Sequence, residues 1–163
     1  MRGRSTRALG SMFDLAAILP QILPAAIAWA EARSSEIRRV GSPLKPFDIR
    51  LASAVGVARP DLVRILEVPS LPMPDDPQLK FAAEQTGLIG PGMVGLTLGY
   101  GIYIVTGHAS NRLVSHECRH VYQYEMAGSI ANFLSVYLQQ IATVGYDDAP
   151  YEIDARRNER DVA

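Results

Sequence analysis

The sequence predicts a single α+β domain that is mostly helical and contains a small sheet. A length of 163 residues corresponds to one domain. Hydrophobic residues make up 48% and charged residues 20%, the ordinary balance of a globular protein. Two segments, 62–68 and 96–105, are β-rich, whereas the other periodic segments have helical spacing. We therefore expect residues 11–163 to form one domain and residues 1–10 to be disordered.

The N-terminal segment has features of a signal peptide and of a core helix. Basic residues precede an apolar stretch, 15–30, which ends in the A-x-A form of a cleavage site. Pro20 and Pro24 interrupt this stretch, and its 16 residues are fewer than the roughly 20 that a membrane-spanning helix needs. We therefore predict an amphipathic helix, kinked at its prolines, that continues to about Arg39.

This interpretation favours a cytoplasmic protein without membrane association. Export, with residues 1–30 as a signal peptide, is the alternative. Anchoring to a membrane surface through residues 13–30 is a weaker one.

Glycine and proline residues separate the next elements. Gly41 and Pro43 end the first helix, because glycine suits the position after a helix and proline cannot continue it. Residues 47–55 repeat with helical spacing, and 62–68 predicts a strand. The prolines between 69 and 77 exclude regular structure there, so this segment is a loop too short to separate two domains.

A short helix near 78–86 and a glycine-rich turn follow this loop. Residues 96–105 predict one strand, in which Gly99 and Gly101 mark a bend or a close approach of another backbone. From residue 111 onward the pattern is helical.

The charge balance and the cysteine content exclude several classes of protein. Sixteen basic residues against seventeen acidic ones leave a formal net charge of −1. This balance excludes a strongly basic nucleic-acid-binding protein and an acidic tail alike. Cys118 is the only cysteine, so no intrachain disulfide can form. The function must therefore depend on a local site.

That site is predicted by His116, Glu117 and His120, which spell H-E-x-x-H in a helical segment. Residues at i and i+4 lie on one face of a helix, so both imidazoles can reach one metal ion. Glu117 points to the side of the pair, where it can take a proton from a zinc-bound water without occupying a coordination position. With this composition the motif is expected by chance only roughly 0.003 times. The motif predicts a Zn²⁺ site.

A catalytic zinc takes three protein ligands, so one more residue is needed. Gly128 ends the motif helix, a second helix spans 129–144, and Asp147 or Asp148 can cap a third with Pro150 in its first turn. Two antiparallel helices can return the chain to the motif at this point.

Glu152 lies in that first turn and is the predicted third ligand. The alternatives are Asp154 and His108, the latter in a loop, and an ordinary glutamate at a helix start also explains Glu152.

A group that polarises the scissile carbonyl is harder to assign. Tyr151 is the best candidate because it is adjacent to Glu152. The other candidates are Tyr122, Tyr124, Tyr146, Arg156 and His108. Cys118 occupies a variable position of the motif and is predicted to pack in the core.

Roughly half of the chain, residues 41–125, resembles a bacterial zinc-metallopeptidase domain associated with extracellular contractile injection systems and polymorphic toxins. The segments that carry the resemblance are Gly41–Leu44, Arg50–Gly56, Val63–Ile65, Leu96–Gly99, Ile102 and Leu113–Gln123. The resemblance implies a zincin-like fold, in which a small sheet flanks the H-E-x-x-H helix. It also implies His116 and His120 as zinc ligands and Glu117 as the catalytic acid and base. The segment Ala149–Ala155 is similar to the glutamate helix of gluzincin peptidases, which supports Glu152.

We therefore expect residues 11–163 to form a zincin-like metallopeptidase domain that hydrolyses a peptide or protein substrate. In this hypothesis the substrate pairs with the strand at 95–105. The alternative is a non-catalytic, zinc-stabilised module that binds a protein or peptide. A structural site closes its fourth coordination position and has no need of Glu117.

Overall fold

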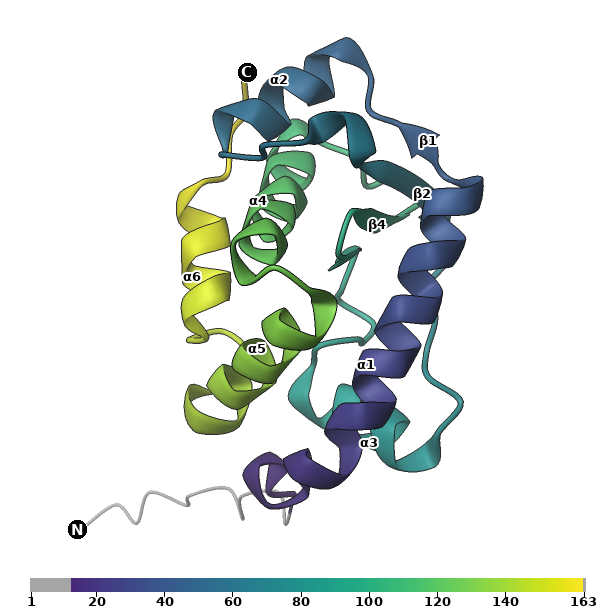
Figure 1. Cartoon of the computed structure of the whole chain (residues 1–163), viewed down its shortest axis with the longest axis vertical. Coiled ribbons are helices and arrows are strands. Elements are labelled where there is room, and N and C mark those ends of the chain that lie inside the picture. Colours follow the sequence, from purple (N-terminus) through teal and green to yellow (C-terminus); the bar gives the residue numbers. More distant parts are fainter. Residues whose placement is uncertain (1–12, 163) are drawn as a thin grey trace, which may run out of the picture.

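The computed structural model describes residues 13–162 and shows a mostly helical α+β chain with one small sheet (Figure 1). In chain order the elements are α1 (Leu15–Val40), β1 (Ser42–Pro43), α2 (Pro46–Ala54), the 3-10 helix η1 (Pro60–Leu62), β2 (Arg64–Val68), α3 (Pro77–Thr86), β3 (Gly95–Leu98), β4 (Gly101–Val105), α4 (Asn111–Ala127), α5 (Ile130–Val144) and α6 (Pro150–Arg157). The α+β class is confirmed, whereas the predicted disorder of residues 1–10 lies outside the described residues.

The sheet has four strands in the order β1-β2-β4-β3 and is mixed. β2 pairs with β4 in parallel, whereas β1 pairs with β2 and β3 pairs with β4 in antiparallel register. The prediction of one strand over 96–105 is wrong, because the segment folds back on itself as the hairpin β3–β4. Gly99 makes the turn possible, since its φ of +66° is one that other residues rarely adopt.

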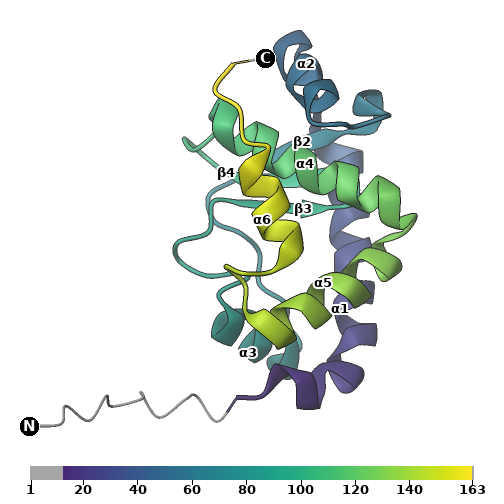
Figure 2. The same cartoon turned by 90° about the vertical axis from the view of Figure 1, so that its left-hand side faces the viewer.

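Helices cover both faces of this sheet (Figure 2). Ile102 and Ile104 of β4 pack against α2 and α4, whereas Tyr103 between them belongs to the core that α1 forms on the other face. Gly101 lets α1 approach closely, because a side chain there would meet Ile37 of α1 at 2.9 Å. The close approach at Gly101 is therefore to α1.

α1 is one continuous helix through Pro20 and Pro24. Its buried residues recur on one side and pack in the main core with α3 and α5: Leu15, Leu19, Ile22, Ala26, Ala30, Ser34 and Ile37. Its most apolar stretch has a mean hydropathy of 1.5, so by length and composition it also resembles a signal sequence or a membrane-spanning helix.

Most element boundaries are close to the predicted ones, with two corrections. Gly41 ends α1 in an extended conformation, φ −74°, because the chain passes directly into β1. Ala149 precedes the first turn of α6, so neither Asp147 nor Asp148 caps that helix. The serines Ser110 and Ser129 do cap α4 and α5, each accepting a hydrogen bond from a backbone N–H of the first turn.

Candidate metal centre

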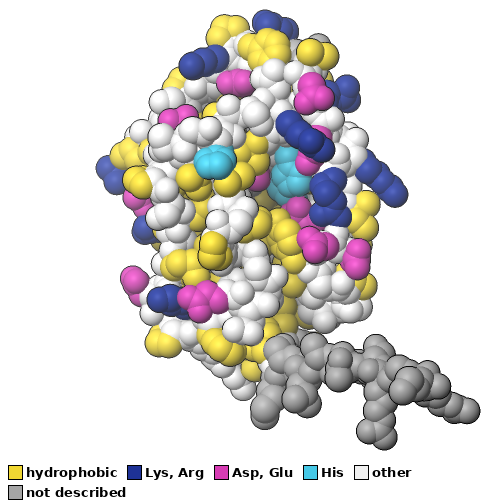
Figure 3. Space-filling model, turned by 180° about the vertical axis from the view of Figure 1, so that it is seen from behind, with side chains coloured by type: hydrophobic (Ala, Val, Ile, Leu, Met, Phe, Trp, Pro, Cys, Tyr) yellow, Lys and Arg dark blue, Asp and Glu magenta, His cyan; other side chains and the backbone are white. Residues whose placement is uncertain are grey.

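α4 presents both histidines of the motif on one side. Ser110 fixes its start, and Gly128 ends it with a left-handed φ of +89°. His116 and His120 lie one turn apart, with ring centroids 5.0 Å from each other. His120 is buried, and 14% of the His116 side chain is exposed. On the face seen in Figure 3, one histidine side chain lies at the surface between acidic and basic side chains, apart from a second histidine.

α6 brings Glu152 to these histidines. The chain turns back after α5, and α6 lies across α4 (Figure 2). The Glu152 carboxylate lies between the two rings, with Oε2 3.3 Å from Nε2 of His116 and Oε1 3.0 Å from Nε2 of His120. One ligand atom from each of the three residues lies within 4.8 Å of the others. Within residues 13–162 this is the one group of three or more His, Cys, Asp and Glu side chains whose ligand atoms converge closely enough to hold a metal ion.

The other nitrogen of each ring is held by a polar partner. Nδ1 of His120 lies 2.7 Å from Oε1 of Gln123, whose amide donates to Asp154 and to the backbone oxygen of Tyr151. Because that amide is used as a donor, Oε1 accepts and Nδ1 of His120 carries the proton. Nδ1 of His116 donates in the same way to Glu159, at 3.0 Å. Both Nε2 atoms are therefore directed at Glu152 as potential ligands.

Without a bound metal, the two histidines and Glu152 shift one another's pKa values. Burial alone would lower the pKa of His120, but the hydrogen bond and the negative charge of Glu152 outweigh it and raise that pKa to about 9. Burial likewise acts to lower the pKa of His116, and Glu152 raises it. For Glu152 burial acts to raise the pKa, but the two histidines hold it well below its usual range. The protons on these histidines are the charges that a bound cation would replace.

Glu117 lies outside this cluster and faces β3. It is buried, and its Oε2 accepts a hydrogen bond of 2.6 Å from the Thr97 hydroxyl. Gly95 lies directly against it, since a Cβ at that position would be 2.6 Å from Oε1 of Glu117. β3 therefore orients the carboxylate that the motif places beside the histidines.

Glu117 and two residues of the cluster, His120 and Glu152, line one small cavity. Its volume is about 20 Å³, close to what one water molecule needs. Its lining includes Glu117, His120, Glu152 and two tyrosines, Tyr137 and Tyr146. The Tyr137 hydroxyl donates to Oε1 of Glu152 at 2.6 Å. The cavity therefore joins a metal-binding cluster to a carboxylate that the cluster does not use.

The structure places the remaining predicted candidates outside the cluster. Asp154 is paired with Arg119 and supports Gln123, and neither it nor His108, which is exposed, belongs to the cluster. The Tyr151 ring stacks on Phe133 at 4.9 Å, and its catalytic role stays a prediction.

Among the other candidates for carbonyl polarisation, the Tyr124 hydroxyl donates to the Thr97 carbonyl. Arg119 lies over the Tyr122 ring, and Arg156 donates to the backbone of Asp147. Cys118 is fully buried in the core, as predicted.

Three supporting residues were not assigned from the sequence. Gln123 and Glu159 hold the histidine rings, and Tyr137 holds Glu152. Tyr137 lies on the buried side of α5, and a buried tyrosine hydroxyl usually needs a polar partner. This requirement for a partner is the signal in the sequence that could have indicated a polar contact of Tyr137.

Comparisons with protein-family models, with curated proteins and with solved structures found no match to this chain. The zincin-like fold expected from the resemblance therefore stays a prediction. The geometry itself shows a His/His/Glu cluster that can bind a metal ion.

Proposed function

We propose that this chain is a zinc-dependent peptidase in which His116, His120 and Glu152 hold the metal. The observation that carries the proposal is the shared cavity, in which Glu117 faces His120 and Glu152 without belonging to the cluster. A purely structural metal site has no use for a further carboxylate held beside the cluster without belonging to it.

The donor set fits zinc. Two neutral imidazoles and one carboxylate are the protein ligands of a well-known class of catalytic zinc sites, and they leave one position for another ligand. Zinc held there would supply Lewis acidity, which lowers the pKa of a bound water to about 7 and polarises a carbonyl. Glu159 and Gln123 fix the tautomers that direct both Nε2 atoms to the metal.

In this proposal Glu117 is the general base. Its carboxylate would take the proton of the attacking water, whose oxygen bonds to the carbonyl carbon, and would give that proton to the amine as the C–N bond breaks. The Thr97 hydroxyl and the backbone of Gly95 keep that carboxylate in place.

Tyr146 lines the same cavity, and burial raises its pKa, so its hydroxyl is protonated and can donate to the carbonyl oxygen of a substrate. Tyr151, the candidate from the sequence, does not line this cavity, and its ring stacks on Phe133.

An extended peptide substrate would bind along β3, the edge strand of the sheet. The hydrogen bond from Val105 N to Val94 O sets the alternation of the β3–β4 ladder. By that alternation Gly95 and Thr97 direct their backbone groups away from β4. The Thr97 carbonyl already accepts from Tyr124, so Gly95 is the residue we expect to pair with substrate beside Glu117.

The first test is the metal content of protein purified without a metal-affinity tag. We expect about one zinc per chain by elemental mass spectrometry, and hydrolysis of a peptide pool by the zinc-loaded protein. Glu117→Gln should keep the zinc and reduce hydrolysis by at least about a hundredfold, the upper range of general-base effects being 10⁴. Hydrolysis at the wild-type rate by this variant would refute the role of Glu117.

The burial of the site favours one second candidate, a non-catalytic zinc-stabilised module that binds a protein or peptide. Glu117, His120 and Glu152 are only 5%, 6% and 2% exposed. Cobalt-substituted protein separates the two functions, since the visible spectrum of Co²⁺ responds to its ligands. A spectrum that changes when acetohydroxamate is added indicates an open coordination position, and an unchanged spectrum supports the structural module.

A further inference from the structure

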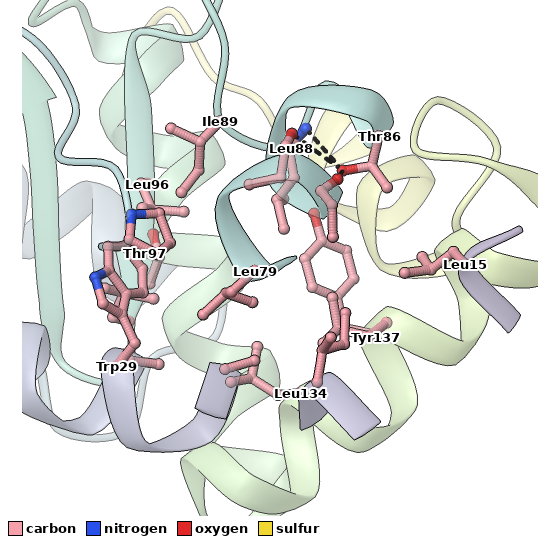
Figure 4. Close-up of a pocket in the computed structure, with 18 of the residues that line it drawn as sticks. Leu15, Trp29, Leu79, Thr86, Leu88, Ile89, Leu96, Thr97, Leu134 and Tyr137 are labelled. Carbon is pink, nitrogen blue, oxygen red and sulfur yellow. Dashed lines mark hydrogen bonds between the residues drawn. The ribbon is translucent and has the colours of Figure 1, made fainter. Parts of the chain in front are cut away.

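An apolar cavity of about 70 Å³ lies between α1, α3, α5 and β3 (Figure 4). Leu79 of α3, Trp29 of α1 and Leu134 of α5 lie around the same hollow. No charged side chain lines this cavity. Native interiors contain few voids of this size, so this one, next to the candidate metal centre, is a candidate binding pocket.

The cavity adjoins the metal centre. Leu88, Leu96, Thr97 and Tyr137 line both this cavity and the smaller one beside Glu117. The Thr97 hydroxyl donates a hydrogen bond to Glu117 on one side of β3. Leu96 and Leu98, which alternate with Thr97 along the strand, line the apolar cavity. A peptide that pairs with β3 beside Gly95 would therefore lie at the junction of the two cavities.

The chemistry of the lining selects an apolar occupant. Each of its four hydroxyl groups is already engaged within the protein. Thr86 donates to the backbone of its own helix, Tyr124 to the Thr97 carbonyl, and Thr97 and Tyr137 to the carboxylates Glu117 and Glu152. A polar group placed among these engaged hydroxyls would lose its hydrogen bonds to water without gaining new ones from them.

The volume selects the size of the occupant. A dry cavity of about 150 Å³ accepts benzene. Half of that volume is enough for a branched aliphatic group and too little for an aromatic ring.

We propose that this cavity is a specificity subsite, which receives an aliphatic side chain of the substrate next to the bond that is cut. The inference rests on the proposed peptidase function and narrows it to peptides with a residue such as leucine or valine at that position. Most of its residues come from α1, α3, α5 and β3, so these elements would select the substrate, whereas the metal-binding residues come from α4 and α6.

The test uses three hydroxamates that share one zinc-binding group. They are acetohydroxamate, 4-methylpentanohydroxamate, which carries an isobutyl group, and 3-phenylpropanohydroxamate. On the zinc-loaded full chain we expect the isobutyl probe to bind about tenfold tighter than acetohydroxamate, and the phenyl probe to gain less. Trp29 is the only tryptophan and lines the cavity, so its fluorescence should change with the isobutyl probe and not with acetohydroxamate.

Two substitutions change the cavity in opposite directions. Ala83→Leu fills it from α3 and should abolish the gain of the isobutyl probe, while acetohydroxamate binds as before. Leu79→Ala enlarges it and should raise the affinity of the phenyl probe to at least that of the isobutyl probe. Ala28→Leu, on the exposed side of α1, is the matched control and should change neither the affinity for the isobutyl probe nor that for the phenyl probe.

The outcomes distinguish a failure of the subsite from a failure of the open metal site. Equal affinity for the three probes in the wild type, or a selectivity that Leu79→Ala leaves unchanged, would overturn the subsite and leave the metal centre intact. Failure of acetohydroxamate itself to bind would overturn the open metal site, and the subsite with it. The Leu79→Ala result decides the matter even if Ala83→Leu does not fold.

Discussion

Gln123 connects the second histidine of the motif to the rest of the molecule. Its oxygen accepts from His120, while its amide donates to Asp154 and to the Tyr151 carbonyl. Asp154 is in turn held by Arg119. The orientation of one metal ligand therefore depends on a chain of polar contacts that joins α4 to α6.

We expect Gln123→Ala to weaken zinc binding by about 10–100-fold, the usual effect of removing a group that orients a metal ligand. Competition with a chromophoric chelator measures this. Gln139→Ala is the control, since Gln139 is exposed on α5 and contacts only its own helix. An unchanged affinity in Gln123→Ala would show that His120 is oriented by packing alone.

Gly95 is the second residue whose replacement tests the site. The added methyl group of Gly95→Ala would lie 2.6 Å from Oε1 of Glu117, so the carboxylate must move and its bond to Thr97 is disturbed. We expect unchanged zinc content, strongly reduced hydrolysis and a loss of about 1–3 kcal/mol in the free energy of unfolding. In Gly90→Ala the methyl group meets open space, so this control should behave as the wild type. Full hydrolysis by Gly95→Ala would argue against the position of Glu117.

The ligands of the cluster follow from the sequence more readily than the residues that support them. His116 and His120 are related by one helical turn, which is local geometry. The position of Glu152 can be predicted because the chain reverses its direction at Gly128 and again at Gly145, which brings α6 back to α4. Glu159, in contrast, contacts His116 from beyond the end of α6, and no local pattern predicts where the chain goes there.

At the scale of elements, α6 is attached to α4 through ionised groups. In metal-free protein the pKa of His120 is raised to about 9 from an ordinary value of 6.5. A raised pKa stabilises the fold fully below pH 6.5, and this stabilisation is lost as pH rises through 9. Because the pKa of Glu152 is lowered, its contribution is present above pH 4.5 and is lost as pH falls.

The metal-free protein should therefore lose stability between pH 6.5 and 9, by about 3 kcal/mol for a shift of this size. Urea unfolding in EDTA at several pH values measures the loss. Glu152→Gln removes the carboxylate that raises the pKa of His120, so its curve should be flatter over this range. A wild-type curve as flat as that of the variant would exclude a charged His120–Glu152 pair.

The hairpin shows why the strands were harder to predict than the helices. Alternation along 96–105 is the same for one long strand as for two short ones joined at Gly99 and Tyr100. The φ of +66° at Gly99 decides between them, and a glycine in the sequence only permits that value. The consequence for the site is large, since β3 becomes an edge strand next to Glu117 while β4 is internal.

At the scale of the whole molecule, a bound metal would stabilise the fold. The cluster joins α4 to α6, so zinc binds the native chain and not the unfolded one. At a free zinc concentration of 100 times its Kd the expected gain is about 2.7 kcal/mol, or a rise in Tm of about 5–10 °C. Thermal unfolding with zinc and with EDTA measures the difference. His116→Ala combined with His120→Ala should remove it, and a rise that persists in this variant would mean that zinc binds elsewhere.

The position of α1 at the start of the chain has a consequence for biosynthesis. α1 ends at Val40, but α5, on which it packs, begins only at Ile130. At about 5–20 residues per second, the ribosome needs about 4–18 s to make the 89 residues between them. During this interval the most apolar stretch of α1, with a mean hydropathy of 1.5, is without α5. Any factor that binds apolar nascent segments, including those that recognise export signals, therefore competes with α5 for α1, and translation speed sets the time available to each.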